Sequence, residues 1–350
     1  MSQIFLNAAL TTICFVAGKS GGHLLPCITQ ATQIINQNTN AQLYIFSSGG
    51  DLDKKIIEKH NHLKHYIPAT LDNPPYQKPW LYPWFACKTA FYFCKSMYKL
   101  YKIKPQKVIS FGGFISIPVC IAAKCLGIPF ELYELNVEPG KTILFLSKFT
   151  KNIYTCFDST KKYFPRNTCI HFDYPIRFTQ NDKALDTNLL LSSYNFSPER
   201  KTIVILGGSQ GSILLNEVMK ETIEKYPALS SKIQIVHQTG KEDTFDYAKF
   251  YHDSHIPCQV FAYHEKLQDF YNLADLIISR AGAGTLFEIK FFGKNCITIP
   301  HETANTNHQI KNVLELQIEN PDQFKIIKQA DFNPSTLYQE LEKLLPMLQQ

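Results

Sequence analysis

The most informative pattern in this sequence lies at residues 275–312, which read DLIISRAGAGTLFEIKFFGKNCITIPHETANTNHQIKN. The apolar run 276–278 is short and sharply bounded, as expected for a buried strand. A small-residue loop at 280–284 follows, then a helix-like segment, and then a second apolar run, 296–299, before Pro300. This order predicts a strand, glycine loop, helix and strand. Such a loop exposes backbone N–H groups at a positive helix end, where a phosphate or diphosphate would bind.

Glu288 in this stretch has two interpretations. With Thr285 three residues before it, Glu288 fits a capping box, in which the glutamate bonds only to the start of its own helix. A carboxylate one turn into a nucleotide-binding helix can instead accept hydrogen bonds from the hydroxyls of a ribose. Spacing alone favours the cap.

The same order of elements occurs at two earlier places. The apolar run 202–206 enters the loop G-G-S-Q-G at 207–211, and the apolar run 12–16 enters a glycine-rich loop at 17–23. A lone glycine loop is a weak signal. Two halves that each begin with strand, glycine loop and helix indicate twin doubly wound domains, and a length of 350 residues suits two domains.

Composition narrows the class of protein. Hydrophobic residues make up 45% of the chain, which is normal for a folded protein. The net charge of +6 fits anionic partners such as phosphates or an acidic lipid surface, but it is too small to argue for nucleic acid, so no nucleic-acid partner is expected. Ten cysteines occur without a C-x-x-C pair, which favours free thiols in a reducing cytoplasm over a disulfide scaffold.

Several common sequence motifs can be excluded. The uncharged start at 4–17 has no basic region and enters a glycine loop, so it is interpreted as the lead-in to a strand rather than a signal peptide. No run of about 18 uncharged apolar residues occurs, so no membrane-spanning helix is expected. The letters Gly-Lys-Ser at 18–20 do not form a Walker A loop, because that motif needs a glycine where this chain has Ile13. No D-x-D pair stands at the end of a predicted strand, so no metal site is expected.

Taken together, R-x-G-A-x-T-x-x-E at 280–288 and H-Q-x-x-N at 308–312 resemble the nucleotide-sugar site of the MurG family. That family comprises the N-acetylglucosaminyltransferases that complete the lipid-linked peptidoglycan precursor. G-G-S-Q-G at 207–211 and V-H-Q-T-G-K at 236–241 follow the family's order and spacing, and the resemblance covers roughly residues 12–312. The chain departs from the family pattern at Lys19, at Tyr133 and Leu135, and at residues 173–174.

The resemblance implies an α/β protein of the GT-B fold, with two Rossmann-like doubly wound parallel-sheet domains facing a cleft. Residues 1–177 would bind the acceptor and the membrane, and residues 178–333 would bind the UDP-sugar. The C-terminal helix at 334–350 is expected to pack back on the first domain.

The implied activity is inverting transfer of N-acetylglucosamine from UDP-N-acetylglucosamine to the 4-hydroxyl of an undecaprenyl-diphosphate-linked muramyl-peptide (lipid I to lipid II). Neither a metal nor another cofactor is expected, because helix N-termini and backbone donors would stabilise the leaving diphosphate. The implied location is peripheral, on the cytoplasmic face of the bacterial inner membrane.

The resemblance also implies roles for individual residues. The family's matching glutamate holds the uridine ribose, which reverses the preference for a cap at Glu288. His23 becomes the candidate general base, because a histidine can take a proton near neutral pH. The other residues implied to bind substrate are Ser20, Gly21, Gly22, Asn136, Arg177, Ser209, Gln210, His264, Ala283, Gly284, Thr285, Leu286, Phe287, His308 and Gln309.

A predicted helix at 80–105 combines lysines with aromatic residues. Helical spacing places four lysines on one face beside Trp84 and Tyr92, and it assigns Ala86, Ala90, Phe93, Met97 and Leu100 to the core face. A solvated lysine face is one interpretation, but interleaved aromatic residues favour a helix resting on an anionic membrane surface. The predicted membrane residues are Trp80, Trp84, Phe85, Lys88, Tyr92, Lys95, Lys99 and Lys102.

Three alternative functions remain open from the sequence. The first is a UDP-sugar transferase that acts on another lipid, such as diacylglycerol. The second is a UDP-N-acetylglucosamine 2-epimerase, which shares the twin-domain fold but has no need of a basic aromatic helix. The third is a nucleotide-sugar binder without activity, which the departures at Lys19, Tyr133 and Leu135 suggest.

Overall fold

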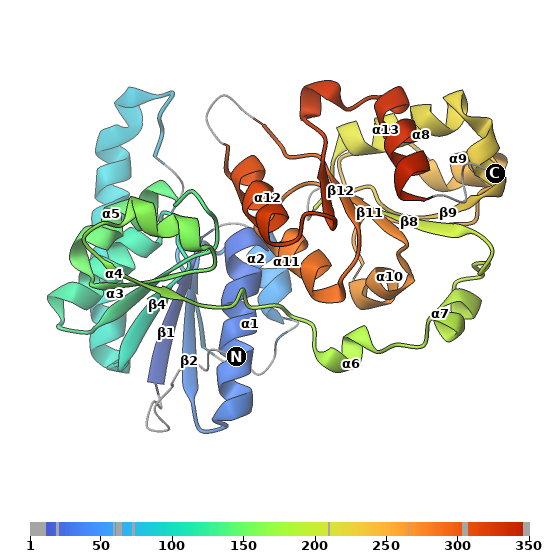
Figure 1. Ribbon diagram of the computed structural model, residues 1–350. Helices are drawn as coiled ribbons and strands as arrows, with labels where there is room; N and C mark the ends of the chain where they lie inside the picture. Colours follow the sequence, from blue (N-terminus) through green and yellow to red (C-terminus); the bar gives the residue numbers. More distant parts are fainter. Residues whose placement is uncertain are drawn as a thin grey trace. The chain divides into compact units, whose positions relative to one another are not determined.

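The computed structural model describes residues 12–18, 21–58, 60, 65–71, 74–208, 211–264, 266–302 and 307–345. The chain forms two compact units, Met1–Arg177 and Phe178–Gln350 (Figure 1). Each unit is built on its own parallel sheet with its own hydrophobic core.

The first unit contains a seven-stranded sheet in the order β3-β2-β1-β4-β5-β6-β7, and every neighbouring pair is parallel. Its central strands are near-continuous apolar runs because helices cover both faces of the sheet. The strands are β1 (Thr12–Ala17), β2 (Gln42–Ser47), β3 (His65–Pro68), β4 (Lys107–Ser110), β5 (Phe130–Glu134), β6 (Asn152–Thr155) and β7 (Thr168–His171).

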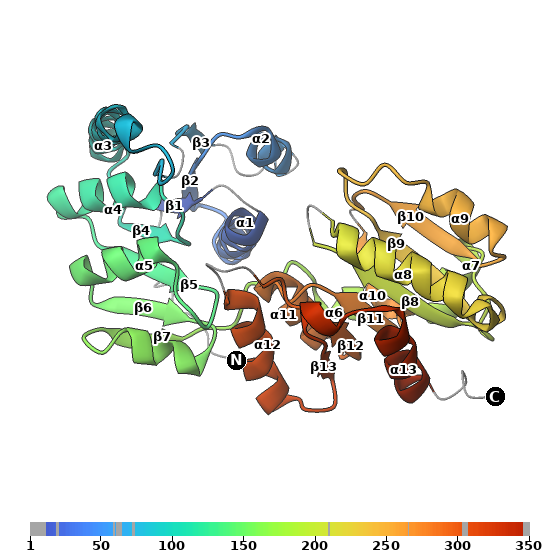
Figure 2. The same ribbon diagram turned by 90° about the horizontal axis from the view of Figure 1, so that it is seen from above.

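Helices connect these strands on both faces. Figure 2 shows α1 and α2 on one face of the sheet and α3, α4 and α5 on the other. The helices are α1 (Gly21–Gln37), α2 (Asp51–Glu58), α3 (Tyr82–Ile103), α4 (Ser116–Cys125) and α5 (Lys141–Leu146), with short 3₁₀ turns η1 (Pro79–Leu81), η2 (Ser147–Phe149) and η3 (Asp158–Tyr163).

The second unit repeats the plan with six parallel strands in the order β10-β9-β8-β11-β12-β13. Figure 1 shows α8, α9 and α13 on one face and α10 and α11 on the other. The strands are β8 (Lys201–Leu206), β9 (Ile233–Gln238), β10 (Cys258–Phe261), β11 (Leu276–Ser279), β12 (Cys296–Thr298) and β13 (Phe324–Ile326).

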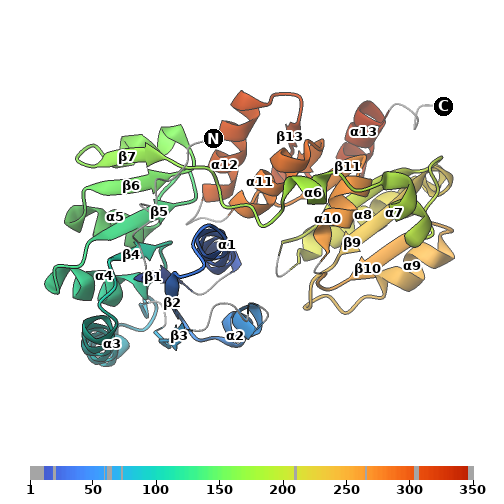
Figure 3. The ribbon, with the colours of Figure 1, turned by 90° about the horizontal axis from the view of Figure 1, so that it is seen from below.

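Its helices are α6 (Gln180–Lys183), α7 (Thr187–Ser193), α8 (Ile213–Lys225), α9 (Tyr247–Asp253), α10 (Leu267–Leu273), α11 (Ala283–Phe292), α12 (His308–Glu319) and α13 (Pro334–Leu344), with 3₁₀ turns η4 (Pro227–Ser231) and η5 (Gln329–Asp331). The short helices α6 and α7 lie beside α10 (Figure 3).

Each sheet reverses its strand order once. The reversal falls between β1 and β4 in the first unit and between β8 and β11 in the second. In doubly wound sheets ligands bind outside the carboxyl ends of the strands at this switch point. The glycine loops singled out from the sequence follow β1, β8 and β11, and a further glycine pair, Gly112–Gly113, follows β4. All four therefore lie at switch points.

The prediction that the C-terminal helix packs on the first domain is wrong for its described part. Leu337 and Leu341 of α13 are fully buried in the core of the second unit, and α13 packs against α8. The rings of Tyr226 and Tyr338 stack there at 3.8 Å. The apolar stripe of α13 therefore buries itself on the unit that immediately precedes it in the chain.

Candidate active site

At the switch point of the first unit, the two glycine loops touch. A Cβ atom added to Gly18 would lie 2.5 Å from the Cα atom of Gly113, and one added to Gly113 would lie 2.2 Å from the Cα atom of Gly18. Gly113 also has a φ of 81°, which strains a residue with a side chain. The floor of this site is therefore made of backbone. Lys19 and Ser20 lie outside the described residues.

His23 stands next to this floor, in the first turn of α1. Its Cε1 atom lies 3.6 Å from the position that a Cβ of Gly112 would occupy. Burial lowers the pKa of His23, and the backbone carbonyl of Phe111 opposes this effect. Within the described residues the Nδ1 atom has no hydrogen-bond partner. The imidazole is therefore neutral near pH 7 and can accept a proton.

Asn136, which follows β5, is held by its neighbour Glu134. One carboxylate oxygen of Glu134 accepts hydrogen bonds from the backbone N–H of Asn136 at 2.9 Å and from its side-chain amide at 3.1 Å. The other oxygen accepts from the backbone N–H of Gly140 at 2.9 Å. Burial raises the pKa of Glu134, and these three hydrogen bonds act to lower it. The loop after β5 is thus organised around one buried carboxyl group.

The two departures flanking Glu134 are core positions. The Tyr133 ring is 1% exposed and stacks on Tyr154 at 4.5 Å, and Leu135 is also buried. Tyr133 and Leu135 depart from the family pattern, but both side chains are buried. Neither departure therefore adds a side chain to the surface at the strand ends. Further along, Tyr174 is buried, whereas Asp173 is exposed.

In the second unit the loop after β8 is equally tight. A Cβ atom on Gly207 would lie 2.4 Å from the backbone nitrogen of Ser212, and one on Gly211 would lie 2.2 Å from the carbonyl oxygen of Thr239. Ser212 is the N-cap of α8, so the loop leads directly to a helix N-terminus. Ser209 and Gln210, predicted at the diphosphate, lie outside the described residues.

Arg280 braces the strand ends around the neighbouring loop. Its guanidinium donates hydrogen bonds to the Ser212 hydroxyl at 3.0 Å, to the Ile299 carbonyl at 3.2 Å and to the Gln329 side chain at 2.9 Å. In the sequence, Arg280 is marked only as the first residue of R-x-G-A-x-T-x-x-E. Its structural role is to join three segments at the carboxyl edge of the sheet.

Gln309 closes the same edge from α12. Its amide oxygen accepts hydrogen bonds from the backbone N–H of Ala281 at 3.2 Å and of His301 at 2.8 Å. The side-chain NH₂ of Gln309 is then the group that can donate to a sugar hydroxyl. His308 is the first residue of α12, so it lies at this edge as well.

Glu288 is not part of a capping box. The N-cap of α11 is Gly282, and the helix begins at Ala283, so Thr285 and Glu288 both lie inside it. The carboxylate of Glu288 instead accepts a hydrogen bond from the Tyr271 hydroxyl at 2.8 Å. This geometry removes the cap interpretation and leaves the carboxylate as a candidate ligand for hydroxyl groups.

The residues before Glu288 can contribute backbone donors. Ala283, Gly284 and Thr285 form the first turn of α11, where N–H groups have no partner within the helix. Leu286 and Phe287 are buried, so their side chains belong to the core. The start of α11 therefore offers an anion-binding helix end at the switch point of the second unit.

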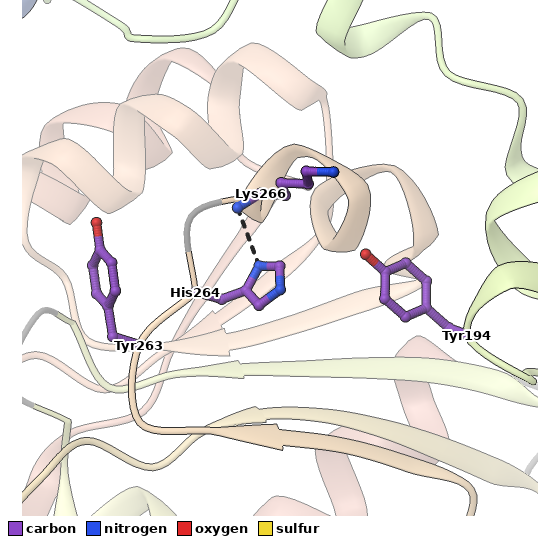
Figure 4. Close-up of a pocket in the computed structure, with 4 residues that line it drawn as sticks. All are labelled: Tyr194, Tyr263, His264 and Lys266. Carbon is purple, nitrogen blue, oxygen red and sulfur yellow. Dashed lines mark hydrogen bonds between the residues drawn. The ribbon is translucent and has the colours of Figure 1, made fainter. Parts of the chain in front are cut away.

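His264 lines a pocket of the second unit, together with Tyr194, Tyr263 and Lys266 (Figure 4). Its Nδ1 atom accepts a hydrogen bond from the backbone N–H of Lys266 at 3.1 Å, which fixes the ring. Tyr194 follows α7, and its hydroxyl donates to Asp269 at 2.7 Å. No sequence motif marks Tyr194, because it approaches the pocket from a distant segment. Arg177 is the last residue of the first unit and is half-buried.

The exposed face of α3 differs from the predicted one. Tyr92, predicted to lie at the membrane, is buried in the core and its hydroxyl is hydrogen-bonded to Thr70 at 2.7 Å. Phe85 packs against Phe114 at 5.0 Å. Ala86 and Ala90, assigned to the core face, are exposed. Leu100 is buried in the core, and Phe93 and Met97 pack against it, as predicted. The prediction of the core face is therefore confirmed for these three residues and wrong for Ala86 and Ala90.

A stripe of aromatic side chains occupies the exposed face instead. Its members are between 60% and 72% exposed and run the length of η1 and α3. We call this set the aromatic stripe: Trp80, Trp84, Phe91, Tyr98 and Tyr101. The predicted lysines flank it, Lys102 exposed and Lys88, Lys95 and Lys99 half-buried. Of the helices that the structure describes, none is long and apolar enough to cross a membrane.

In the described ranges, no cluster of three or more His, Cys, Asp or Glu side chains is arranged to hold a metal ion. The cysteines are free thiols, and burial raises the pKa of several, such as Cys120 and Cys296, each to about 12.

Comparison with known proteins identifies the family. The glycosyltransferase family 28 N-terminal domain matches residues 13–155, and the C-terminal domain of the same family matches residues 202–350. A relative from Geotalea uraniireducens (strain Rf4) is named UDP-N-acetylglucosamine--N-acetylmuramyl-(pentapeptide) pyrophosphoryl-undecaprenol N-acetylglucosamine transferase. It is 26% identical over 331 residues, which cover 94% of this chain and 88% of the relative.

Solved structures agree on the fold. MurG from Acinetobacter baumannii matches with a TM-score of 0.69 at 24% identity, covering 96% of this chain and 91% of that one. A UDP-N-acetylglucosamine 2-epimerase matches with a TM-score of 0.66 at 13% identity, covering 96% and 87%. The fold is GT-B, as the sequence predicted, and its two parallel-sheet units with glycine loops at the switch points are those of a nucleotide-sugar glycosyltransferase. The chain belongs to glycosyltransferase family 28 and, within it, to the MurG family.

Proposed function

We propose that this protein transfers N-acetylglucosamine from UDP-N-acetylglucosamine to the 4-hydroxyl of an undecaprenyl-diphosphate-linked muramyl-peptide, the lipid I to lipid II step of peptidoglycan synthesis. The observation that supports this best is the position of Glu288, inside a helix that starts at a switch point and outside any capping box. The names of the relatives point to the same reaction.

The donor would bind to the second unit. Glu288 would accept hydrogen bonds from the uridine ribose, and the pocket at His264 would receive the uracil. Backbone N–H groups at the start of α11, with Ser209 and Gln210, would hold the diphosphate. Gln309 and His308 would meet the sugar hydroxyls.

The acceptor would bind to the first unit, with its diphosphate near the glycine loop at Ser20, Gly21 and Gly22. Asn136 and Arg177 would contact substrate. The acceptor would thus bind to residues 1–177 and the donor to residues 178–333.

The chemical step forms a bond from the acceptor O4 to the anomeric carbon and breaks the bond from that carbon to the diphosphate oxygen. The electron pair of the broken bond leaves with UDP. His23, neutral because burial lowers its pKa, takes the proton of the 4-hydroxyl. Attack from the face opposite UDP inverts the configuration. Helix N-termini and backbone donors carry the leaving charge without a metal.

The protein would reach its acceptor as a peripheral protein on the cytoplasmic face of the bacterial inner membrane. The aromatic stripe on η1 and α3 supports this, because tryptophan and tyrosine favour the membrane–water interface and the flanking lysines favour anionic lipid. Phe85 and Tyr92 are not part of this surface.

The test uses the purified 350-residue chain and UDP-N-acetylglucosamine, with a short-chain lipid-linked muramyl-peptide or diacylglycerol as acceptor, with and without excess EDTA. The expected products are UDP and a β-linked disaccharide lipid in both conditions, and His23→Ala should lose most of the turnover. Transfer only to diacylglycerol, or formation of UDP-N-acetylmannosamine without acceptor, would replace the proposal with one of its rivals. Activity that EDTA abolishes and magnesium restores would reject the metal-free step alone.

A further inference from the structure

The hydroxyl of Tyr271 donates a hydrogen bond of 2.8 Å to Oε2 of Glu288. Tyr271 lies on α10 and is 1% exposed, whereas Glu288 lies on the neighbouring helix α11. A tyrosine that is almost fully buried has one use for its hydroxyl, which is to find a partner inside the protein. Here that partner is the carboxylate assigned to the ribose.

Aromatic packing fixes the Tyr271 ring. It stacks on Phe292 with centroids 4.8 Å apart and an interplanar angle of 13°, and the edge of Phe178 meets it at 5.7 Å. Phe178 also contacts Phe292 at 5.2 Å, so the three rings form a closed cluster within the second unit. The hydroxyl of Tyr271 therefore has a defined position and cannot follow a moving carboxylate.

Glu288 and Phe292 are four residues apart on α11, so both face α10. The same face of α11 thus supplies the ring that holds Tyr271 and the carboxylate that Tyr271 bonds. A glutamate side chain has three rotatable bonds, and a donor at a fixed position removes most of that freedom before a ligand arrives.

We infer that Tyr271 is a positioning residue for nucleoside recognition, which holds the Glu288 carboxylate in the orientation that accepts the ribose hydroxyls. This inference rests on the proposed function, because it requires Glu288 to bind ribose. Tyr271 itself does not touch the donor. Its effect on affinity must therefore act only through Glu288. It must also be confined to ligands that carry the ribose 2′-hydroxyl.

The experiment measures calorimetric affinities of the 350-residue chain for UDP and 2′-deoxy-UDP. The variants are Tyr271→Phe, Glu288→Gln and the double variant. The parent should prefer UDP by about tenfold, the size expected for one charge-assisted hydrogen bond. Tyr271→Phe should reduce that preference to about threefold, with the affinity for 2′-deoxy-UDP changed less than about twofold. Glu288→Gln should remove it, and the double variant should match Glu288→Gln, because a positioning residue has no effect once its target is gone.

Tyr226→Phe is the matched control, since Tyr226 is another stacked tyrosine of the same unit. The substitution removes a hydroxyl that is hydrogen-bonded to Ser335 at 3.4 Å. It should leave the preference unchanged. A thermal melt of each variant checks folding.

Two results would overturn the inference, and they are distinguishable. If Glu288→Gln abolishes the preference and Tyr271→Phe leaves it intact, or if the two effects multiply in the double variant, Tyr271 does not act through Glu288 and the proposed ribose role stands. If Glu288→Gln leaves the preference unchanged, the ribose role itself fails and the inference fails with it.

Discussion

Glu134 holds Asn136 at two points, the backbone N–H and the side-chain amide, while its second oxygen reaches Gly140. One buried carboxyl group thereby sets both the course of the loop and the direction of the only amide side chain in it. In the structure, Glu134 therefore orients its neighbour Asn136.

Glu134→Gln should therefore impair turnover more than donor binding. A glutamine cannot accept hydrogen bonds through its nitrogen, so one of the three donors is left unsatisfied, at a cost of about 1–3 kcal/mol. We expect kcat to fall about tenfold or more, with UDP affinity of the second unit unchanged. Glu131→Gln on the same strand, whose carboxylate pairs with Lys107 at 3.0 Å, is the control. Equal losses in both variants would show general damage to β5 rather than misplacement of Asn136.

A second buried polar network should make the stability of the second unit depend on pH. His237 accepts a hydrogen bond at Nδ1 from the Tyr251 hydroxyl at 2.8 Å and donates from Nε2 to Asn216 at 2.9 Å. Asn216 donates in turn to Asp243 at 2.8 Å. Burial lowers the pKa of His237 to about 3, and the charge of Asp243 opposes this shift.

Because the folded-state pKa is lowered, the unfolded chain takes up a proton near pH 6.5 that the folded chain refuses until about pH 3. The stability contribution is complete above pH 6.5 and falls by about 1.4 kcal/mol per pH unit below it. Urea unfolding at pH 7 and pH 5 should show this loss in the parent and a smaller loss in His237→Gln. Identical pH dependence in the two proteins would contradict the assignment, since other titrating groups are common to both.

The lysines beside the aromatic stripe should control binding to anionic lipid. Each lysine near the surface contributes about 1 kcal/mol, so replacing Lys88, Lys95, Lys99 and Lys102 by glutamine should weaken binding to anionic vesicles by orders of magnitude. Raised salt should mimic the substitution in the parent, because exposed charges are screened over about 10 Å at 0.1 M. Co-sedimentation with vesicles across a salt series is the measurement.

Two further variants separate charge from the aromatic stripe. Replacing Lys225, Lys249, Lys328 and Lys343 of the second unit removes the same charge and should have little effect. Trp80→Ala with Trp84→Ala should weaken binding to neutral vesicles as well, because these rings are 72% and 70% exposed. If replacing the second-unit lysines weakens vesicle binding as much as replacing the α3 lysines, membrane contact through α3 is excluded.

The packing of α13 on α8 predicts a large stability effect far from any ligand. Leu341 is 0% exposed, so Leu341→Ala should lower the free energy of unfolding by about 2–4 kcal/mol through lost burial and the cavity left behind. Leu314→Ala on α12 is the matched control, because Leu314 is 46% exposed and its truncation should cost under about 0.5 kcal/mol. Chemical denaturation of both variants measures the free energy of unfolding. If both variants lose a similar small amount of it, α13 does not belong to the core.

The strands that matter most for the site were predictable because they are buried on both faces. Runs such as 202–206 and 276–278 are almost entirely apolar, and each leads into a glycine loop, so their type and their carboxyl ends could be identified. The edge strands β3 and β7 were not predicted, because half-exposed strands carry no continuous apolar run. The strand β9 was not predicted either, although all its residues are buried, because Gln234, His237 and Gln238 interrupt its apolar run.

The face of α3 could not be predicted from side-chain polarity. The prediction took the lysines as the marker of the surface and therefore placed Tyr92 outside. In the structure the Tyr92 hydroxyl is hydrogen-bonded to Thr70, and Ser96 donates a hydrogen bond to the Tyr92 carbonyl within the core. The aromatic residues Phe91 and Tyr98 face outwards, where pattern reasoning did not place them. Large aromatic side chains occur on both sides of this helix, so hydrophobicity alone does not distinguish its core face from its exposed face.

The cap interpretation of Glu288 failed for a local reason. Thr285 has the chemistry of an N-cap, but Gly282 starts the helix three residues earlier, with ψ of 137°. The Tyr271 partner could not be found from the sequence at all, since it comes from another helix and no spacing rule links the two.

The contact between Gly18 and Gly113 also bears on inhibition. A compound that hydrogen-bonds to this floor would address main-chain atoms, which no exchange of side chain removes. The substitutions that would alter the floor, at Gly18 or Gly113, force the two backbones apart. A substitution that weakens such a compound without moving the backbone would therefore have to change the side chains around the floor, not the two glycines that form it.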